Sequence, residues 1–110
     1  MKFDPDILAE VTLLLTEEGG RAGPTLPDMF GCPLGFQDKF FDMRMDLTEI
    51  GRLAPGSTAK VPIRFLCPDL VVPRLRVGSE FTLWEGKTLG SGFVIEVKRD
   101  SSSKPNGLAS

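Results

Sequence analysis

The strongest indication of the fold is the stretch FTLWEGKTLGSGFVIEV, residues 81–97. Two runs rich in β-branched and aromatic residues flank Glu85-Gly86-Lys87, which is typical of a β-hairpin. We expect its arms at Glu80–Trp84 and Thr88–Lys98. Alternation along the second arm places four residues on one face, Leu89, Phe93, Ile95 and Val97.

Two glycines of the second arm, Gly90 and Gly92, fall on the face opposite those four residues. A glycine inside a strand often marks a place where another backbone approaches closely. We therefore expect a neighbouring backbone or aromatic ring beside them.

The same alternation predicts strands in the rest of the chain. We expect extended segments at 7–16, 36–47 and 58–66, each with one apolar face. Pro62 interrupts the last of these, so its amide position must lie at an edge, at a bulge or toward solvent. Residues 69–72, between Pro68 and Pro73, are expected to be a short extended connection.

The segment 22–35 contains glycine or proline at six positions and is predicted to be a long loop. Four apolar residues suggest that this loop packs back onto the rest of the protein, Leu26, Met29, Phe30 and Leu34. Long ordered loops in compact domains are often functional, so this segment is a candidate contact region.

Composition favours a single globular domain. The chain has 110 residues, 41% of them hydrophobic and 25% charged, with a formal net charge of −2. We expect one β-barrel domain at 1–100 and a disordered polar tail at 101–110. The negative charge disfavours a strong non-specific nucleic-acid binder. Without a signal-peptide pattern or a long apolar run, we expect a cytoplasmic protein that does not enter the membrane.

Five or six strands with few helical patterns indicate an all-β protein, either a small antiparallel barrel or a sandwich. Three segments in this order resemble the C-terminal (third) domain of elongation factor Tu: Thr16–Arg21, Leu53–Pro68 and the hairpin Phe81–Val97. The resemblance covers about residues 8–98 and implies a closed six-stranded antiparallel β-barrel, here without the GTPase domain. In that family the domain helps to hold the T stem of aminoacyl-tRNA, and Lys39 and Arg44 are the matching residues that could meet phosphate.

The residues offer no catalytic, metal or cofactor site. Gly86-Lys87-Thr88 resembles the end of a phosphate-binding loop, but Phe81 stands where that motif needs glycine, and a strand follows instead of a helix. Cys32 and Cys67 are expected to be unpaired thiols. Two cysteines without any histidine fall short of a closed zinc site, and Cys32 lacks a histidine to activate it.

We therefore expect a non-enzymatic binding module that engages a protein partner or associates with itself. Methionine and aromatic residues are enriched at interfaces, and the candidate contact residues are Met29, Phe30, Phe36 and Phe40. The alternative is a translation-associated module that binds tRNA or other RNA weakly through a basic patch made of Lys39, Arg44, Arg74 and Arg76.

Overall fold

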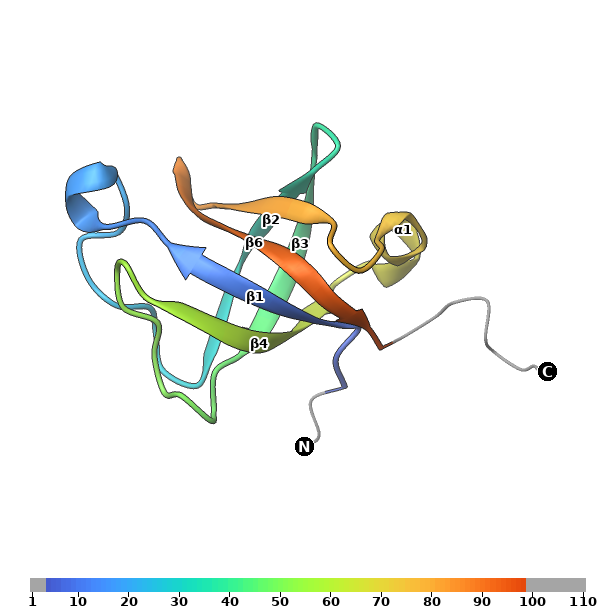
Figure 1. Ribbon diagram of the computed structural model, residues 1–110, viewed down its shortest axis with the longest axis horizontal. Coiled ribbons are helices and arrows are strands. Elements are labelled where there is room, and N and C mark those ends of the chain that lie inside the picture. The colour runs from blue at the N-terminus through green and yellow to red at the C-terminus, as the bar shows by residue number, and fades with distance from the viewer. Residues whose placement is uncertain (1–3, 99–110) are drawn as a thin grey trace, which may run out of the picture.

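The computed structural model describes residues 4–98, so the predicted polar tail at 101–110 lies outside the described residues. Six antiparallel strands close into a barrel in the order β1-β4-β3-β2-β5-β6 (Figure 1). Closure removes exposed sheet edges, which an open sheet of this size would present. The strands are β1 (Ile7–Leu13), β2 (Met29–Phe36), β3 (Lys39–Asp46), β4 (Thr58–Phe65), β5 (Glu80–Trp84) and β6 (Thr88–Val97). The helical turns are η1 (Thr16–Glu18), α1 (Pro68–Val71) and η2 (Val72–Arg74).

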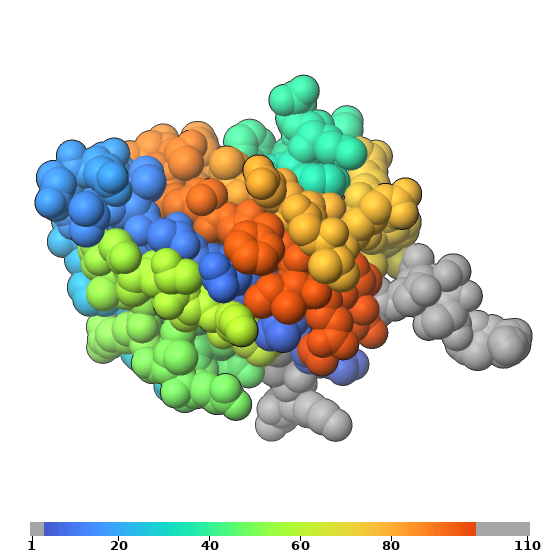
Figure 2. All heavy atoms as spheres, viewed as in Figure 1, coloured from blue at the N-terminus to red at the C-terminus, as the bar shows by residue number. Residues whose placement is uncertain are grey.

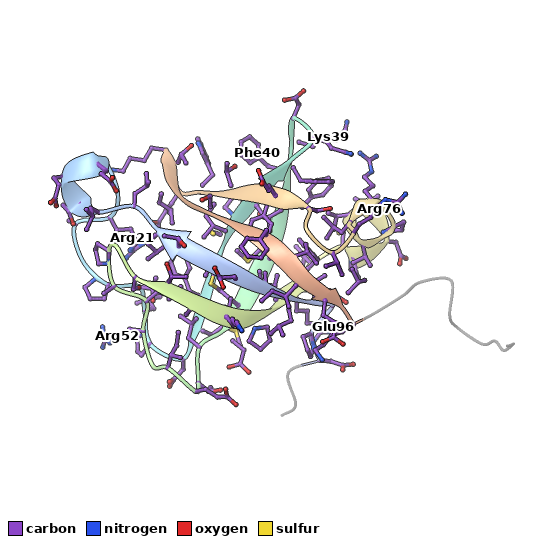
Figure 3. All side chains as sticks on the ribbon, viewed as in Figure 1. Arg21, Lys39, Phe40, Arg52, Arg76 and Glu96 are labelled. Carbon is purple, nitrogen blue, oxygen red and sulfur yellow. The ribbon has the colours of Figure 1, made fainter. Side chains whose placement is uncertain are left out.

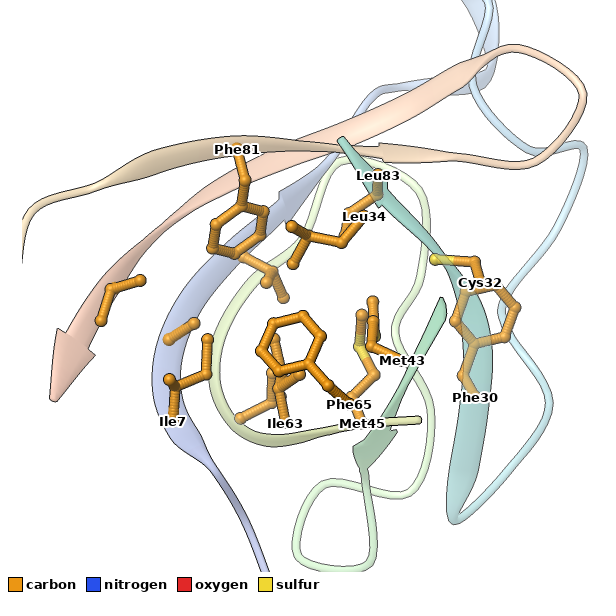
Figure 4. Packing of buried hydrophobic residues seen from close by; sticks show 14 of the residues in the cluster. Ile7, Phe30, Cys32, Leu34, Met43, Met45, Ile63, Phe65, Phe81 and Leu83 are labelled. Atoms are coloured by element: carbon orange, nitrogen blue, oxygen red, sulfur yellow. The ribbon is translucent and has the colours of Figure 1, made fainter. Parts of the chain in front are cut away.

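Alternating apolar residues fill the interior of the barrel. Ile7, Met43, Ile63 and Leu83 are buried and belong to one hydrophobic cluster (Figure 4). The apolar faces of β1, β3 and β4 point inward, because side chains in a strand point alternately to the two sides of the sheet. The predicted segments 7–16 and 36–47 are too long: β1 ends at Leu13, so Leu15 is 42% exposed, and β3 begins at Lys39. The all-β fold class and the closed six-stranded antiparallel barrel are likewise what the structure shows.

The predicted loop 22–35 is wrong in its second half. β2 begins at Met29 and pairs with β3 over its whole length, although it contains Gly31, Pro33 and Gly35. Pro33 is tolerated because the pairing of β2 with β5 begins only at Leu34, so no ladder bond to β5 is lost.

The remaining loop is anchored by a polar residue. Thr25 is buried, its amide donates to the Leu53 carbonyl, and its hydroxyl accepts from the Leu53 amide at 3.0 Å. Leu26, one of the residues expected to pack inward, is 66% exposed. The loop therefore packs back as predicted, but through hydrogen bonds to residue 53.

Two further predictions need correction. Residues 68–74 form α1 and η2 rather than an extended connection, because a proline at the start of each turn has its φ preset for helix. In β6, Val94 is fully buried, whereas Phe93 is 41% exposed. The β1–β6 register shifts so that Leu8 opposes Glu96 and Ala9 opposes Val94, which leaves a bulge at Ile95. The β5–β6 register shifts as well and skips Leu89, so the residues between the two irregularities alternate in a different phase and Phe93 points outward.

The predicted crowding at the β6 glycines is confirmed. A Cβ atom on Gly92 would lie 2.4 Å from the Glu10 carbonyl oxygen and 2.8 Å from the Phe81 ring. A Cβ atom on Gly90 would lie 2.6 Å from the Thr12 carbonyl oxygen. Both positions accept only glycine without displacement of β1.

Pro62 is accommodated at the end of a ladder. It pairs with Leu8 of β1, but the β3–β4 pairing ends at its neighbour Ile63. The Ile63 carbonyl accepts from the Asp6 amide on the β1 side, so the Pro62 nitrogen faces β3, where no pairing partner remains.

Candidate functional site

A row of small residues crosses the outer face of the barrel. The register places Gly35 of β2 opposite Thr82 of β5, Thr82 opposite Ser91 of β6, and Ser91 opposite Thr12 of β1. Side chains at directly paired positions lie next to each other on one face of a sheet. These four residues therefore form a low floor between the taller side chains on either side.

Aromatic side chains stand along this floor. Phe40 lies opposite Gly35 on β3, and its ring is 5.3 Å from the ring of Trp84, centroid to centroid. Phe93 follows Ser91 on the outer face of β6. Phe40, Trp84 and Phe93 are 58%, 37% and 41% exposed, so each presents ring surface to solvent.

The floor residues and the side chains of Phe40 and Phe93 line an open groove of about 800 Å³, whereas Trp84 lies against Phe40 and does not line it. The turn residues 37–39 border its end, where the β2–β3 hairpin projects beyond the barrel (Figure 1). Figure 2 looks onto this side of the molecule, where atoms of β1, β6 and β5 lie side by side below the hairpin tip. Ligand sites are typically concave with a few polar groups, and a volume of this size is within their range.

The hairpin tip has a defined backbone. Gln37 and Asp38 have φ values of 53° and 64°, and Phe36 pairs with Lys39. Positive φ at both central residues is the signature of a type I′ turn, which matches the twist of the two strands. The tip is therefore held in register with β2 and β3.

The four predicted protein-contact residues do not lie together. Phe36 and Phe40 line the groove. Met29 is at the other end of β2, about 23 Å away by strand rise. Phe30 is 4% exposed and therefore presents little surface to a partner in this structure.

Phe30 has a structural partner instead. The Arg21 guanidinium lies 5.2 Å from the centre of the Phe30 ring and pairs with the Glu85 carboxylate. Its Nε and Nη2 atoms donate to the carbonyls of Gly23 and Pro24, each at 3.2 Å. Phe30 is thus covered by an arginine that holds the 21–24 segment against the barrel.

The four predicted RNA-contact residues are all exposed, but they come from separate places. Lys39 is at the hairpin tip, while Arg76 lies beside the α1 region (Figure 3). Arg44 points outward from the middle of β3. Lys39 lies four residues before the inward-facing Met43, so it is on the same side of the strand as Met43, but at the end of β3 next to the turn. Lys39 and Arg44 therefore do not share a face of β3.

Most of the groove residues carry no recognisable pattern in the sequence. Alternation predicts that Phe93 shares a face with Leu89 and Val97, because irregular pairing within β6 is invisible in simple alternation. Thr12, Thr82 and Ser91 are ordinary outward residues of three strands, and only the register aligns them. The only part of the groove that alternation in the sequence indicates is the outward face of β5, which carries Glu80, Thr82 and Trp84.

The cysteines are both free thiols, as predicted. Burial raises the pKa of the Cys32 thiol from 9.0 to about 12, so its thiolate is scarce at neutral pH. Within residues 4–98, no group of three or more histidine, cysteine, aspartate or glutamate residues could hold a metal ion. No helix in the same range has the length and apolar character needed to cross a membrane.

Neither the protein-family models nor the curated proteins include a match to this sequence.

Proposed function

We propose that this chain is a non-enzymatic binding module that holds a segment of a partner protein in the outer groove. The observation that carries the proposal is the row Gly35, Thr82, Ser91 and Thr12, bordered by exposed aromatic rings. Aromatic residues, phenylalanine among them, are enriched in protein interfaces. The hydroxyl groups of the floor can donate to and accept from a peptide backbone.

A catalytic role has less support. The Cys32 thiol is buried, and its raised pKa keeps it protonated at neutral pH. The Cys67 thiol is exposed, but the chain contains no histidine to activate it. The relationship to the third domain of elongation factor Tu stays a proposal, supported by the resembling segments and by the closed six-stranded barrel. Cytoplasmic location also stays a prediction.

One observation favours RNA binding as a second candidate. Arg44 of β3 lies directly opposite Arg64 of β4, and like charges in this position repel. No ion pair within residues 4–98 includes either guanidinium. A phosphate between them would relieve the repulsion, so this pair is the place where an RNA backbone would bind.

The two candidates are separated by an affinity capture from lysate at low and moderate salt, with identification of proteins and RNA. The bait is compared with Phe40→Ala/Phe93→Ala, which removes two groove walls. The control is Leu66→Ala/Leu70→Ala, because Leu66 and Leu70 are 69% and 61% exposed and do not line the groove. Equal urea midpoints for all three proteins establish that each is folded.

We expect a salt-resistant protein that is captured by the wild type and by the leucine control but lost with the phenylalanine variant. A photo-crosslinking residue at Thr82 must then attach to the same protein, whereas one at Thr48 must not. If the phenylalanine variant captures the protein as well as the wild type does, the groove is not the contact surface. Recovery of RNA that falls steeply with salt and needs Arg44 and Arg64 supports the second candidate instead.

A further inference from the structure

Two carboxylates flank an exposed aromatic ring at one wall of the groove. Phe93 of β6 is directly opposite Glu10 of β1 on one side and Glu80 of β5 on the other. All three side chains line the groove. Neither glutamate belongs to an ion pair within residues 4–98, although Lys60 of β4 is the cross-strand partner of Glu10 on the side away from Phe93.

The charge of the groove is negative as a whole. Its lining contains three acidic residues, Glu10, Asp38 and Glu80, and one basic residue, Lys39. Three negative charges and one positive charge leave a net charge of −2 in the groove. A partner segment that fills this groove needs a positive charge to match it.

The arrangement fits a guanidinium group better than an ammonium group. Neighbouring strands place the Cβ atoms of Glu10 and Glu80 about 10 Å apart with Phe93 between them. A planar guanidinium stacks on an aromatic ring and donates to carboxylates from its edge at the same time. An ammonium group cannot make both contacts with the same geometry.

The protein already uses this combination elsewhere. The Arg21 guanidinium covers the Phe30 ring and pairs with the Glu85 carboxylate. The groove contains the aromatic and acidic parts of the same arrangement without the arginine.

We propose that the groove binds an extended partner segment through an arginine side chain, which stacks on Phe93 between Glu10 and Glu80. This inference rests on the proposed function and adds the chemistry of the partner. The rest of the segment lies along the floor of Thr12, Ser91 and Thr82 toward Phe40.

The test is a titration of ¹⁵N-labelled protein at low salt, followed by amide chemical shifts. The probe is the capped peptide Ser-Gly-Ser-Arg-Ser-Gly-Ser, and its control carries citrulline, a neutral isostere, in place of arginine. We expect the arginine peptide to shift the amides of Glu10, Thr82 and Phe93 at millimolar concentration. We expect binding about three- to tenfold weaker in Glu10→Gln/Glu80→Gln, as two exposed ion pairs are lost. Glu49→Gln, outside the groove, should bind as the wild type does.

Three outcomes overturn the inference. If the citrulline peptide shifts the same amide resonances as much as the arginine peptide does, the groove binds peptide without a preference for arginine. The proposed function then stands and this inference fails. If millimolar arginine peptide does not shift the amide resonances of the groove residues, the groove does not bind arginine and the inference fails. The proposed function fails as well only if the Phe40→Ala/Phe93→Ala variant still captures the partner protein. A dimer in analytical ultracentrifugation that Glu10→Gln/Glu80→Gln dissociates shows that a second copy, rather than a partner protein, fills the groove.

Discussion

Replacement of Gly92 by alanine introduces a single methyl group at the tightest point between β1, β5 and β6. Its Cβ atom would lie 2.4 Å from the Glu10 carbonyl oxygen and 2.8 and 2.9 Å from two carbons of the Phe81 ring. Carbon and carbonyl oxygen normally make contact at about 3.3 Å. The new group therefore requires a displacement of about 0.9 Å.

The structure resists that displacement. The Glu10 carbonyl belongs to β1, which pairs with β4 on one side and with β6 on the other. Phe81 is 4% exposed and has little room to rotate away. Overpacking a well-packed interior typically costs 1–3 kcal/mol, so we expect a loss of about 3 kcal/mol for Gly92→Ala. In a domain of this size that lowers the melting temperature by roughly 15 °C.

Urea unfolding measures the effect through the midpoint and the slope of the transition. The matched control is Gly23→Ala, since Gly23 has no atom within 4 Å of the added Cβ and no positive φ. We expect Gly23→Ala to be neutral or more stable by about 0.5 kcal/mol, because alanine reduces the entropy of the unfolded chain. Gly92→Ala/Phe81→Leu should recover only part of the loss, since the Glu10 carbonyl remains in place.

A Gly92→Ala protein that unfolds at the wild-type urea concentration would show that the close approach of β1 to β6 does not constrain residue 92. Full recovery in the double variant would place the whole cost on the Phe81 ring and none on the backbone.

Three further predictions concern the hairpin tip, a buried carboxylate and a buried thiol. Asp38→Gly should raise the unfolding free energy by about 0.5–1 kcal/mol in urea, because glycine adopts the positive φ of 64° without steric cost. Asp6→Ala should lower it by about 2–3 kcal/mol, since the carboxylate accepts from the buried Phe65 amide at 2.8 Å, while Asp6→Asn, which keeps an acceptor, should cost less. Stability should fall as pH rises from about 9 toward 12, because the unfolded Cys32 thiol ionises near its ordinary pKa of 9.0 and the folded thiol has a pKa of about 12. Urea midpoints against pH should show this loss, at about 1.4 kcal/mol per pH unit, in the wild type but not in Cys32→Ala.

Each of these results has a contrary outcome. A less stable Asp38→Gly protein contradicts the type I′ turn, and equal losses for Asp6→Ala and Asp6→Asn contradict the role of the carboxylate oxygen as acceptor. The same alkaline slope in wild type and Cys32→Ala would assign the loss to other titrating groups.

The bulge at Ile95 shows why the groove could not be predicted in full. A shift of one residue in register exchanges the two faces of a strand. Phe93 and Val94 are adjacent apolar residues, so either phase of β6 gives one of them to the interior. The pairing of Ala9 with Val94 decides the phase, and that pairing is a property of the assembled barrel.

The prediction of a loop at 22–35 was wrong over its second half for a related reason. Glycine and proline weaken a strand locally, and their density in this segment favours a loop. β2 nevertheless forms, because β3 pairs with all eight of its residues and Pro33 lies where β5 has not yet joined. Tertiary pairing outweighed the local preference.

Alternation and glycine placement are local properties of the chain, so the all-β class, the apolar faces of β1, β3 and β4, and the crowding at Gly90 and Gly92 could be predicted without the structure. The candidate site depended on tertiary structure. Gly35, Thr82, Ser91 and Thr12 come from four strands, and no local pattern relates them. Only closure of the barrel fixes the register between those strands, and the register alone brings the small residues into one row beside Phe40 and Phe93.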